Sequence, residues 1–265
     1  MGRNQLVFGF ILLLVGSLML AGQMGVRLPN GTSPMDLFWP LALLGAGAWV
    51  LFGVFYKGNV ETENASIDLQ GASSVDLKIG HGAGELKIHS GANVSEVAHG
   101  TFVGGLNHKA NRNGDRLEVR MRPAKEVMDI PFLGPRSQLN WDVALNANVP
   151  TALVMNLGAN KSMIDLHDMN ITDLKLETGA SDTRLTLPAH GRFKADLDLG
   201  AAALEVIVPV GLSARIRTST GAADVKIDES RFPHSGGYYQ SADFDSASNA
   251  ADITIDAGAA SIRVK

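Results

Sequence analysis

Hydrophobic and polar residues follow one pattern in the first 58 residues and a different pattern in the rest of the chain. Two uncharged, mostly apolar runs come first, one between Arg3 and Arg27 and the other between Asp36 and Lys57. A helix of roughly 20 apolar residues crosses the ~30 Å core of a bilayer. The pattern therefore predicts two transmembrane helices, at about residues 5–25 and 36–56, which form a membrane anchor over residues 1–58.

Two alternatives to this anchor are buried core helices and, for the first run, a cleaved signal peptide. Two such long runs in tandem argue against core helices. The junction after the first run, MLAGQMG, has no clear A-x-A cleavage site. Trp39 and Tyr56 lie at opposite ends of the second run, where interfacial aromatic residues are common. We therefore expect both runs to span the membrane.

The charges beside the two runs bear on orientation. Two spans place both ends of the anchor on the same side of the membrane. Arg3 and Lys57 would lie on that side, and Arg27 in the connecting loop would lie on the other. The positive-inside rule then favours the cytoplasmic side for everything after residue 58. The sequence thus predicts a multi-pass protein of the cytoplasmic (inner) membrane.

A Gly-Ala pair recurs in the second part of the chain at a constant spacing of 21 residues. One earlier pair has the same flanking pattern, and the last pair follows after an additional 16 residues. We expect a glycine at the corner of each repeat, where it supplies a positive φ. The six predicted corner glycines are Gly82, Gly158, Gly179, Gly200, Gly221 and Gly258.

Apolar residues alternate with polar ones on both sides of these corners, as in half-buried strands. Ile164, Leu185, Val206 and Ile227 each lie six residues after a corner glycine. A fixed period with like residues at like positions indicates a solenoid whose coils bury their apolar face by stacking. The fold class predicted for residues 59–265 is an all-β single-stranded β-helix with coils of about 21 residues, in which these four residues stack in one column.

Two segments interrupt the repeat, near residues 122–140 and 229–250. One interpretation is that both are loops that cover an end or a flank of the stack. The other is that they contact a partner through their aromatic residues, because such side chains often anchor interfaces. The candidate contact residues are Phe132, Phe232, Tyr238, Tyr239 and Phe244.

Composition and charge exclude several classes of function. The net charge is −4, without the basic surplus expected of a nucleic-acid-binding protein. The chain contains no cysteine, which excludes disulfides, thiolate metal sites and a cysteine nucleophile.

No catalytic motif stands out. The seven histidines share no position in the repeat and have no metal-ligand spacing, so we expect each at the surface. Ser181 and Asp182 follow one Gly-Ala pair, but unlike residues occupy the equivalent corners, and the outward positions show mixed charge without a cluster. We expect no enzyme activity, no catalytic residues, no cofactor and no metal.

Several stretches resemble a known family. The second apolar run, MDLFWPLALLGAGAWVLFGVF, is similar to the membrane region of LiaF-like bacterial proteins. HGAGELKIHSGANVSEVAHGTF, the stretch from Asn140 to Pro188 and ADITIDAGAASIRVK resemble the toastrack domain that follows such regions. The resemblance implies a coiled β architecture behind a membrane hairpin. It also implies an accessory role in envelope-stress signalling, with a sensor kinase or another membrane protein as partner and no catalytic residues.

Three functions compete at this point. The first is a non-enzymatic, membrane-anchored interaction or sensory module in cell-envelope (lipid or antibiotic) stress signalling. The second is a self-assembling scaffold similar to bactofilin polymers, because the chain ends on a regular coil without a cap of its own. The third is a surface adhesin or a β-helical enzyme, which needs an outward-facing domain or a groove with clustered carboxylates.

Overall fold

The computed structural model describes residues 62–124 and 139–265, together with six helical residues: Ser17, Leu20, Pro40, Leu43, Leu44 and Gly47. The chain separates into two compact units, and the second comprises Asn59–Val127 and Ser137–Lys265. Apart from those six residues, both predicted transmembrane segments lie outside the described residues, as do Phe132 and most of the 122–140 interruption. Within the described part, no helix is long and apolar enough to cross a membrane.

The described part of the second unit is all-β, as the alternating pattern predicts. Its strands are β1 (Thr62–Asp68), β2 (Ser74–Ser90), β3 (Glu96–Val103), β4 (Leu106–Asn113), β5 (Arg116–Pro123), β6 (Leu139–Leu145), β7 (Thr151–Asp165), β8 (Ile171–Thr178), β9 (Asp182–Thr186), β10 (Arg192–Leu199), β11 (Ala203–Ile207), β12 (Ser213–Thr220), β13 (Asp224–Ile227), β14 (His234–Ser235), β15 (Tyr238–Gln240), β16 (Ala250–Ala257) and β17 (Ser261–Val264).

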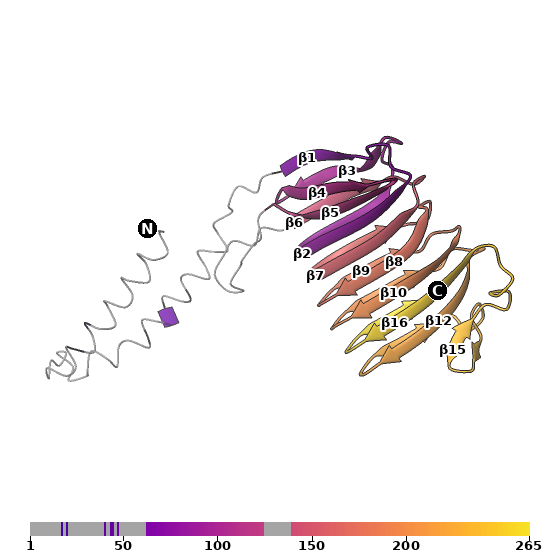
Figure 1. The fold of residues 1–265 in the computed structure, drawn as a ribbon. Helices are drawn as coiled ribbons and strands as arrows, with labels where there is room; N and C mark the ends of the chain where they lie inside the picture. The colour runs from indigo at the N-terminus through magenta and orange to yellow at the C-terminus, as the bar shows by residue number, and fades with distance from the viewer. Residues whose placement is uncertain are drawn as a thin grey trace, which may run out of the picture. The chain divides into compact units, whose positions relative to one another are not determined.

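Most of these strands form a parallel stack with two faces joined at a corner (Figure 1). The long strands β2 and β7 pass through the corner and contribute to both faces. On the first face the strand order is β4–β5–β2–β7–β8–β10–β16–β12–β15–β14. On the second face it is β1–β3–β6–β2–β7–β9–β11–β17–β13.

Antiparallel strands close the N-terminal end of the stack, where the sequence repeat is blurred. On the first face β4 pairs antiparallel with β5, and on the second face β3 pairs antiparallel with both β6 and β1. Trp141 and Phe102 pack edge to face in the core at this end, with ring centroids 5.0 Å apart.

The core lies between the two faces and is built from aligned rows of aliphatic side chains. In one row, Leu153, Leu174, Ala195, Ile253 and Ile216 occupy matching positions of successive strands. Each of them is at most 1% exposed. Burying one such Leu or Ile contributes about 1.5–3 kcal/mol to folding, so the stacking of the coils is the main source of stability.

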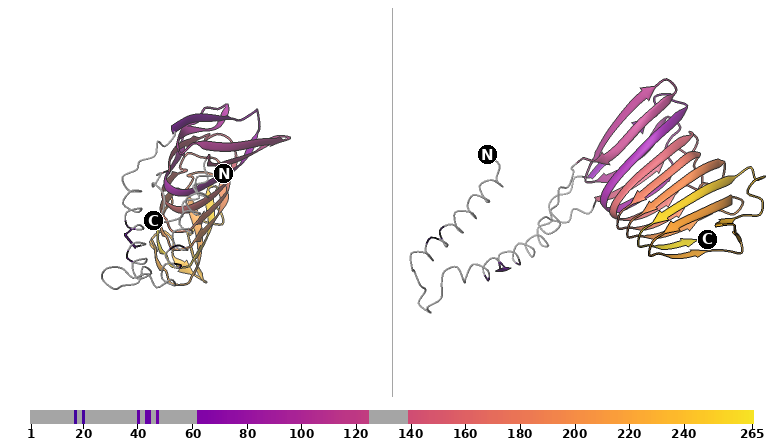
Figure 2. Two further views of the ribbon diagram at one scale, coloured as in Figure 1. Left: turned by 90° about the vertical axis from the view of Figure 1, so that its left-hand side faces the viewer. Right: turned by 60° about the horizontal axis from the view of Figure 1, so that its bottom comes forward.

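The C-terminal coil does not lie at the end of the stack. Strands β16 and β17 lie between β10/β11 and β12/β13, and pair in parallel with both. Figures 1 and 2 show the yellow C-terminal strand among the orange ones. Val264 therefore separates Val206 from Ile227, which the sequence pattern places in direct contact. The expectation that the chain ends on an uncapped terminal coil is wrong.

The interruption after β13 instead covers part of the real end. Strand β15 pairs antiparallel with the outer edge of β12, with Arg215 opposite Gln240 and Ile216 opposite Tyr239. The remainder of this edge, including all of β13, has no strand beyond it among the described residues. Residues 229–249 thus form a partial cap.

The six predicted corner glycines form one continuous column in the order Gly82, Gly158, Gly179, Gly200, Gly258 and Gly221. None of them has a positive φ, so the expected reason for glycine is wrong. Close approach between coils explains it instead. A Cβ on Gly158 would lie 2.1 Å from the carbonyl oxygen of Gly82, and a Cβ on Gly200 would lie 2.8 Å from that of Gly179.

Candidate functional site

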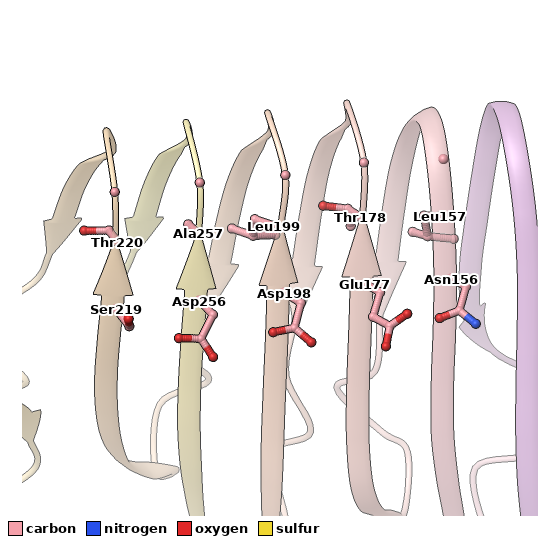
Figure 3. A pocket seen from close by; sticks show the side chains of 15 residues that line it. Asn156, Leu157, Glu177, Thr178, Asp198, Leu199, Ser219, Thr220, Asp256 and Ala257 are labelled. Atoms are coloured by element: carbon pink, nitrogen blue, oxygen red, sulfur yellow. The ribbon is translucent and has the colours of Figure 1, made fainter.

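A shallow groove follows the glycine column across five adjacent strands (Figure 3). Its lining consists of five three-residue segments that each end in a corner glycine: 156–158, 177–179, 198–200, 256–258 and 219–221. Parallel pairing keeps equivalent residues in register, so the groove repeats the same shape about every 4.8 Å. Such a groove matches an extended ligand that lies across the strands.

A row of carboxylates lies along this groove. Glu177, Asp198 and Asp256 occupy adjacent strands at the same register position, between Asn156 and Ser219 at the two ends of the row. In Figure 3 their side chains project on the same side of the strands. The expectation that outward positions carry no charge cluster is therefore wrong.

One lysine partly neutralises this row. Lys175 Nζ lies 2.7 Å from Glu177 Oε1 and 4.0 Å from Asp198 Oδ2. The hydrogen bond to Glu177 raises the pKa of Lys175, which therefore stays charged at neutral pH. Asp256 has no ion-pair partner among the described residues. The row thus keeps a net negative charge that is greatest towards Asp256.

The chemistry of the groove suits binding. Its carboxylates lie on one column without a histidine, and no lining residue forms a nucleophile–base pair. In residues 62–124 and 139–265, no group of histidine and acidic side chains has the geometry of a metal site. Carboxylates at regular spacing attract cationic groups, and the backbone at the glycine corners is accessible because no side chain covers it.

A second depression lies on the other face, where acidic and basic side chains are mixed and part of the charge is paired. Asp142 Oδ2 is 3.1 Å from Lys87 Nζ, and Asp142 Oδ1 is 2.9 Å from His89 Nε2. Burial raises the pKa of Asp142, but the hydrogen bonds from Lys87 and His89 outweigh that effect and lower it. This depression carries three basic residues beside its four acidic ones, so it attracts cationic ligands less strongly than the groove does.

Glu205, which also lines the second depression, is paired in the same way. Its carboxylate lies 2.6 Å from Lys265 Nζ and 2.6 Å from Arg184 Nε. The hydrogen bonds from Lys265 and Arg184 lower its pKa.

His81 is buried, contrary to the expectation that all seven histidines lie at the surface. It is 1% exposed, its ring lies 5.4 Å from that of Trp141, and its Nδ1 lies 3.5 Å from Asn160 Nδ2. Burial lowers the pKa of His81 to about 4, so the side chain is neutral at pH 7. His81 Nε2, Trp141 Nε1 and Asn160 Oδ1 have no hydrogen-bond partners among the described residues.

The predicted aromatic contact residues of the second interruption are divided between interior and surface. Phe232 is 1% exposed and Phe244 is 4% exposed, so both pack inside the domain and present no contact surface. Tyr238 and Tyr239 are half-buried on β15. The Arg215 guanidinium lies 4.2 Å from the Phe244 ring centroid, which fixes the cap to β12.

Ser181 and Asp182 are neighbours at one corner of the repeat, but they differ in burial. Asp182 is exposed, as expected for the outside of a turn, but Ser181 is only 9% exposed. Thr183 Oγ1 donates a hydrogen bond of 3.3 Å to Ser181 Oγ. Ser181 is therefore an interior corner residue, and it lies outside the acidic groove.

The fold is that of a toastrack-type β-domain, a stack of coils with a linear groove along one corner. The chain belongs to the family described as the N-terminal domain of toast_rack, DUF2154, whose model matches residues 56–207. No curated protein sequence matches the chain.

Two solved structures resemble the chain to different degrees. A candidate cell adhesion protein from Clostridium sporogenes ATCC 15579 has a TM-score of 0.63 at 19% identity, covering 78% of this chain and 99% of that one. At this identity the likeness shows the fold alone. A candidate adhesin from Bacteroides fragilis NCTC 9343 is more distant, with a TM-score of 0.31 at 6% identity, 79% of this chain and 98% of that one being covered.

Proposed function

We propose that this protein is a non-enzymatic, membrane-anchored interaction module that docks a basic, extended segment of a protein partner in its acidic groove. The observation that carries the proposal is the row of Glu177, Asp198 and Asp256 along a continuous groove. Each carboxylate is one strand from the next, so a partner strand or loop with several Lys or Arg residues can engage all three at once.

The remaining parts of the proposal come from the sequence and the family. The two apolar runs at about residues 5–25 and 36–56 support membrane anchoring. The resemblance to LiaF-like proteins supports an accessory or regulatory role in bacterial cell-envelope stress signalling. A sensor kinase or another membrane protein of that response is the expected partner, with the domain on the cytoplasmic side.

A comparison of two charge-neutralised variants tests the groove. The groove variant carries Glu177→Gln, Asp198→Asn and Asp256→Asn, and the control carries Asp115→Asn, Glu118→Gln and Asp173→Asn, three exposed acids outside the groove. Both lose the same charge. Exposed ion pairs contribute about 0.5–1 kcal/mol each, so the groove variant should bind a lysine-rich peptide roughly 10–100-fold more weakly.

The same two variants then serve as bait in detergent-solubilised membranes. The proposal expects the wild type and the control to capture the same membrane partner and the groove variant to lose it. Equal capture by both variants would show that the partner does not use the groove. If the wild type captures no membrane or signalling protein, the proposed function itself is refuted.

The free edge of β13 favours a second candidate, end-to-end assembly into a scaffold. Val225 and Ile227 are only half-buried there, and unpaired strand edges can pair with another copy. Sedimentation of the detergent-solubilised protein separates the two functions, because a mass that does not change with concentration excludes polymerisation.

A further inference from the structure

The C-terminal coil, β16 with β17, occupies a slot between two coils that precede it in the sequence. It pairs with β10/β11 on one side and β12/β13 on the other, over Arg192–Leu199, Ala203–Val206, Ser213–Thr220 and Asp224–Ile227. Its apolar residues Ile253, Ile255, Ile262 and Val264 are at most 1% exposed. The chain order and the spatial order of the coils therefore differ here, as they also do at the N-terminal end, where β2 lies between β5/β6 and β7.

The two coils on either side of the slot could also stack directly on each other. Three loops connect successive coils: residues 166–170, 187–191 and 208–212, each five residues long. The first two move the chain by one coil, whereas the third spans two coils because β16/β17 lies between them. The third loop is thus no longer than a loop that advances the chain by a single coil.

The side chains match in this alternative register as well. Gly200 and Gly221 are 21 residues apart, the same spacing as in the directly stacked pairs Gly158–Gly179 and Gly179–Gly200. A shift of β12/β13 by one coil would place Ala195 beside Ile216 and Val206 beside Ile227. These pairings are apolar, so closing the slot buries the edges that withdrawal of the C-terminal coil would otherwise expose.

The connection to the C-terminal coil is long enough to let it move. Residues 228–249 join β13 to β16 and contain the β14–β15 hairpin, whose contacts are with β12. A chain of this length spans up to about 70 Å when extended. The C-terminal coil can thus reach beyond its own stack while the cap residues remain covalently joined to β13.

We propose that the C-terminal coil is an exchangeable element and that the slot accepts the same coil from a second copy of this chain. The slot fits β16/β17 residue by residue, and the same segment of another copy offers identical hydrogen bonds and side chains. Exchange of identical elements forms dimers at low cost, because the native contacts are all remade. Closure of the donor's own slot lowers the cost of the intermediate.

Disulfide trapping tests this, and the natural chain contains no cysteine that would interfere. Ala203, Ser261 and Asp224 are exposed and occupy one register row on β11, β17 and β13. Neighbouring strands are about 4.8 Å apart, which permits a disulfide, whereas Cα atoms two strands apart exceed the limit of about 7 Å. Ala203→Cys/Ser261→Cys in one full-length chain is the positive control for the native order.

The exchange itself is measured with two full-length chains of different tag size in detergent, one carrying Ala203→Cys and the other Ser261→Cys. The expected result is a covalent heterodimer that accumulates with time under mild oxidation, with the 203–261 bond identified by mass spectrometry. Val210→Cys replaces Ser261→Cys in the collision control, because Val210 is 95% exposed and lies outside the strands. Heterodimer yield no greater than in this control overturns the proposal.

Closure of the slot is measured separately, with a disulfide within one chain. Ala203→Cys/Asp224→Cys in one chain reports direct stacking of β11 on β13, which are two strands apart when the C-terminal coil is in place. The proposal expects a slow intrachain disulfide over the period in which the heterodimer forms. Absence of this bond while the positive control oxidises fully also overturns the proposal. Neither measurement depends on the acidic groove or on a partner protein.

Discussion

The corner glycines provide the sharpest quantitative test of the fold. Alanine at three of them adds the same methyl group to the same column but against different surroundings. A Cβ at Gly158 would lie 2.1 Å from Gly82 O, one at Gly179 would lie 3.3 Å from Gly158 O, and one at Gly82 would have no heavy atom within 4 Å. None of the three has a positive φ, so backbone strain does not complicate the comparison.

The expected cost of each substitution follows from these distances. Gly158→Ala forces the two coils apart by about 1 Å at the corner, which overpacking data place at roughly 1–3 kcal/mol. Loss of a ladder hydrogen bond adds about 1 kcal/mol. Gly179→Ala requires a shift of a few tenths of an ångström, which the lower entropy of the unfolded alanine chain, about 0.4–1 kcal/mol, offsets. Gly82→Ala should be neutral or slightly stabilising for the same reason.

Thermal unfolding of the detergent-solubilised protein, followed through the fluorescence of the buried Trp141, measures these differences. For a domain of this size, 1 kcal/mol corresponds to about 2–4 °C in Tm. Gly158→Ala should therefore lower Tm by roughly 5–15 °C, while the other two variants stay close to the wild type. Equal losses for Gly158→Ala and Gly82→Ala would refute close approach as the reason for glycine at these corners.

Two further predictions concern the buried His81 and the partial cap formed by residues 229–249. The pKa of His81 is about 4 in the folded protein, against 6.5 for an unperturbed histidine. As the pH falls, the unfolded chain therefore protonates this histidine before the folded chain does. Stability should therefore drop by up to about 3 kcal/mol between pH 6.5 and 4, and denaturant unfolding of His81→Leu should lack this part of the pH dependence; an unchanged slope would contradict the assignment. Arg215 Nε donates to Gln240 Oε1 at 2.6 Å and its guanidinium lies 4.2 Å from the Phe244 ring centroid, so Arg215→Lys should loosen the cap by about 1–2 kcal/mol and speed proteolysis within residues 229–249. Arg217 lies on the same strand as Arg215 but pairs with Asp252 of β16 instead of the cap. Arg217→Lys should therefore leave the cleavage rate unchanged, and equal rates for the two variants would contradict the role of Arg215.

The sequence predicts the repeating coils well, but it predicts their spatial order in the stack poorly. Alternation and the 21-residue spacing identify the strands, the corner positions and most of the core, because each is a local consequence of burial on one side. The position of the C-terminal coil could not be predicted in this way. The pattern around Gly258 matches that around Gly200 and Gly221 equally, so periodicity alone cannot say which coils are neighbours.

The candidate site was open to prediction, but its signal lies before each corner glycine, whereas the variable residues of the turns lie after it. Glu177, Asp198 and Asp256 each lie two residues before a corner glycine, and this regular offset is visible in the chain. The antiparallel strands before β7 gave no such signal, because their partners are distant in sequence and set by tertiary pairing. Burial of His81 was open to prediction, because the equivalent position in the next coil is occupied by the apolar Leu157.

The interleaved C-terminal coil also has a consequence for biosynthesis. Its residues leave the ribosome after those of the coils on both sides of it. A nascent chain can stack β12/β13 in a provisional position and must then reopen that junction once β16 and β17 have emerged. Completion of the stack thus reports that translation has passed β17, and a chain cut short before residue 250 keeps a stack that is one coil shorter.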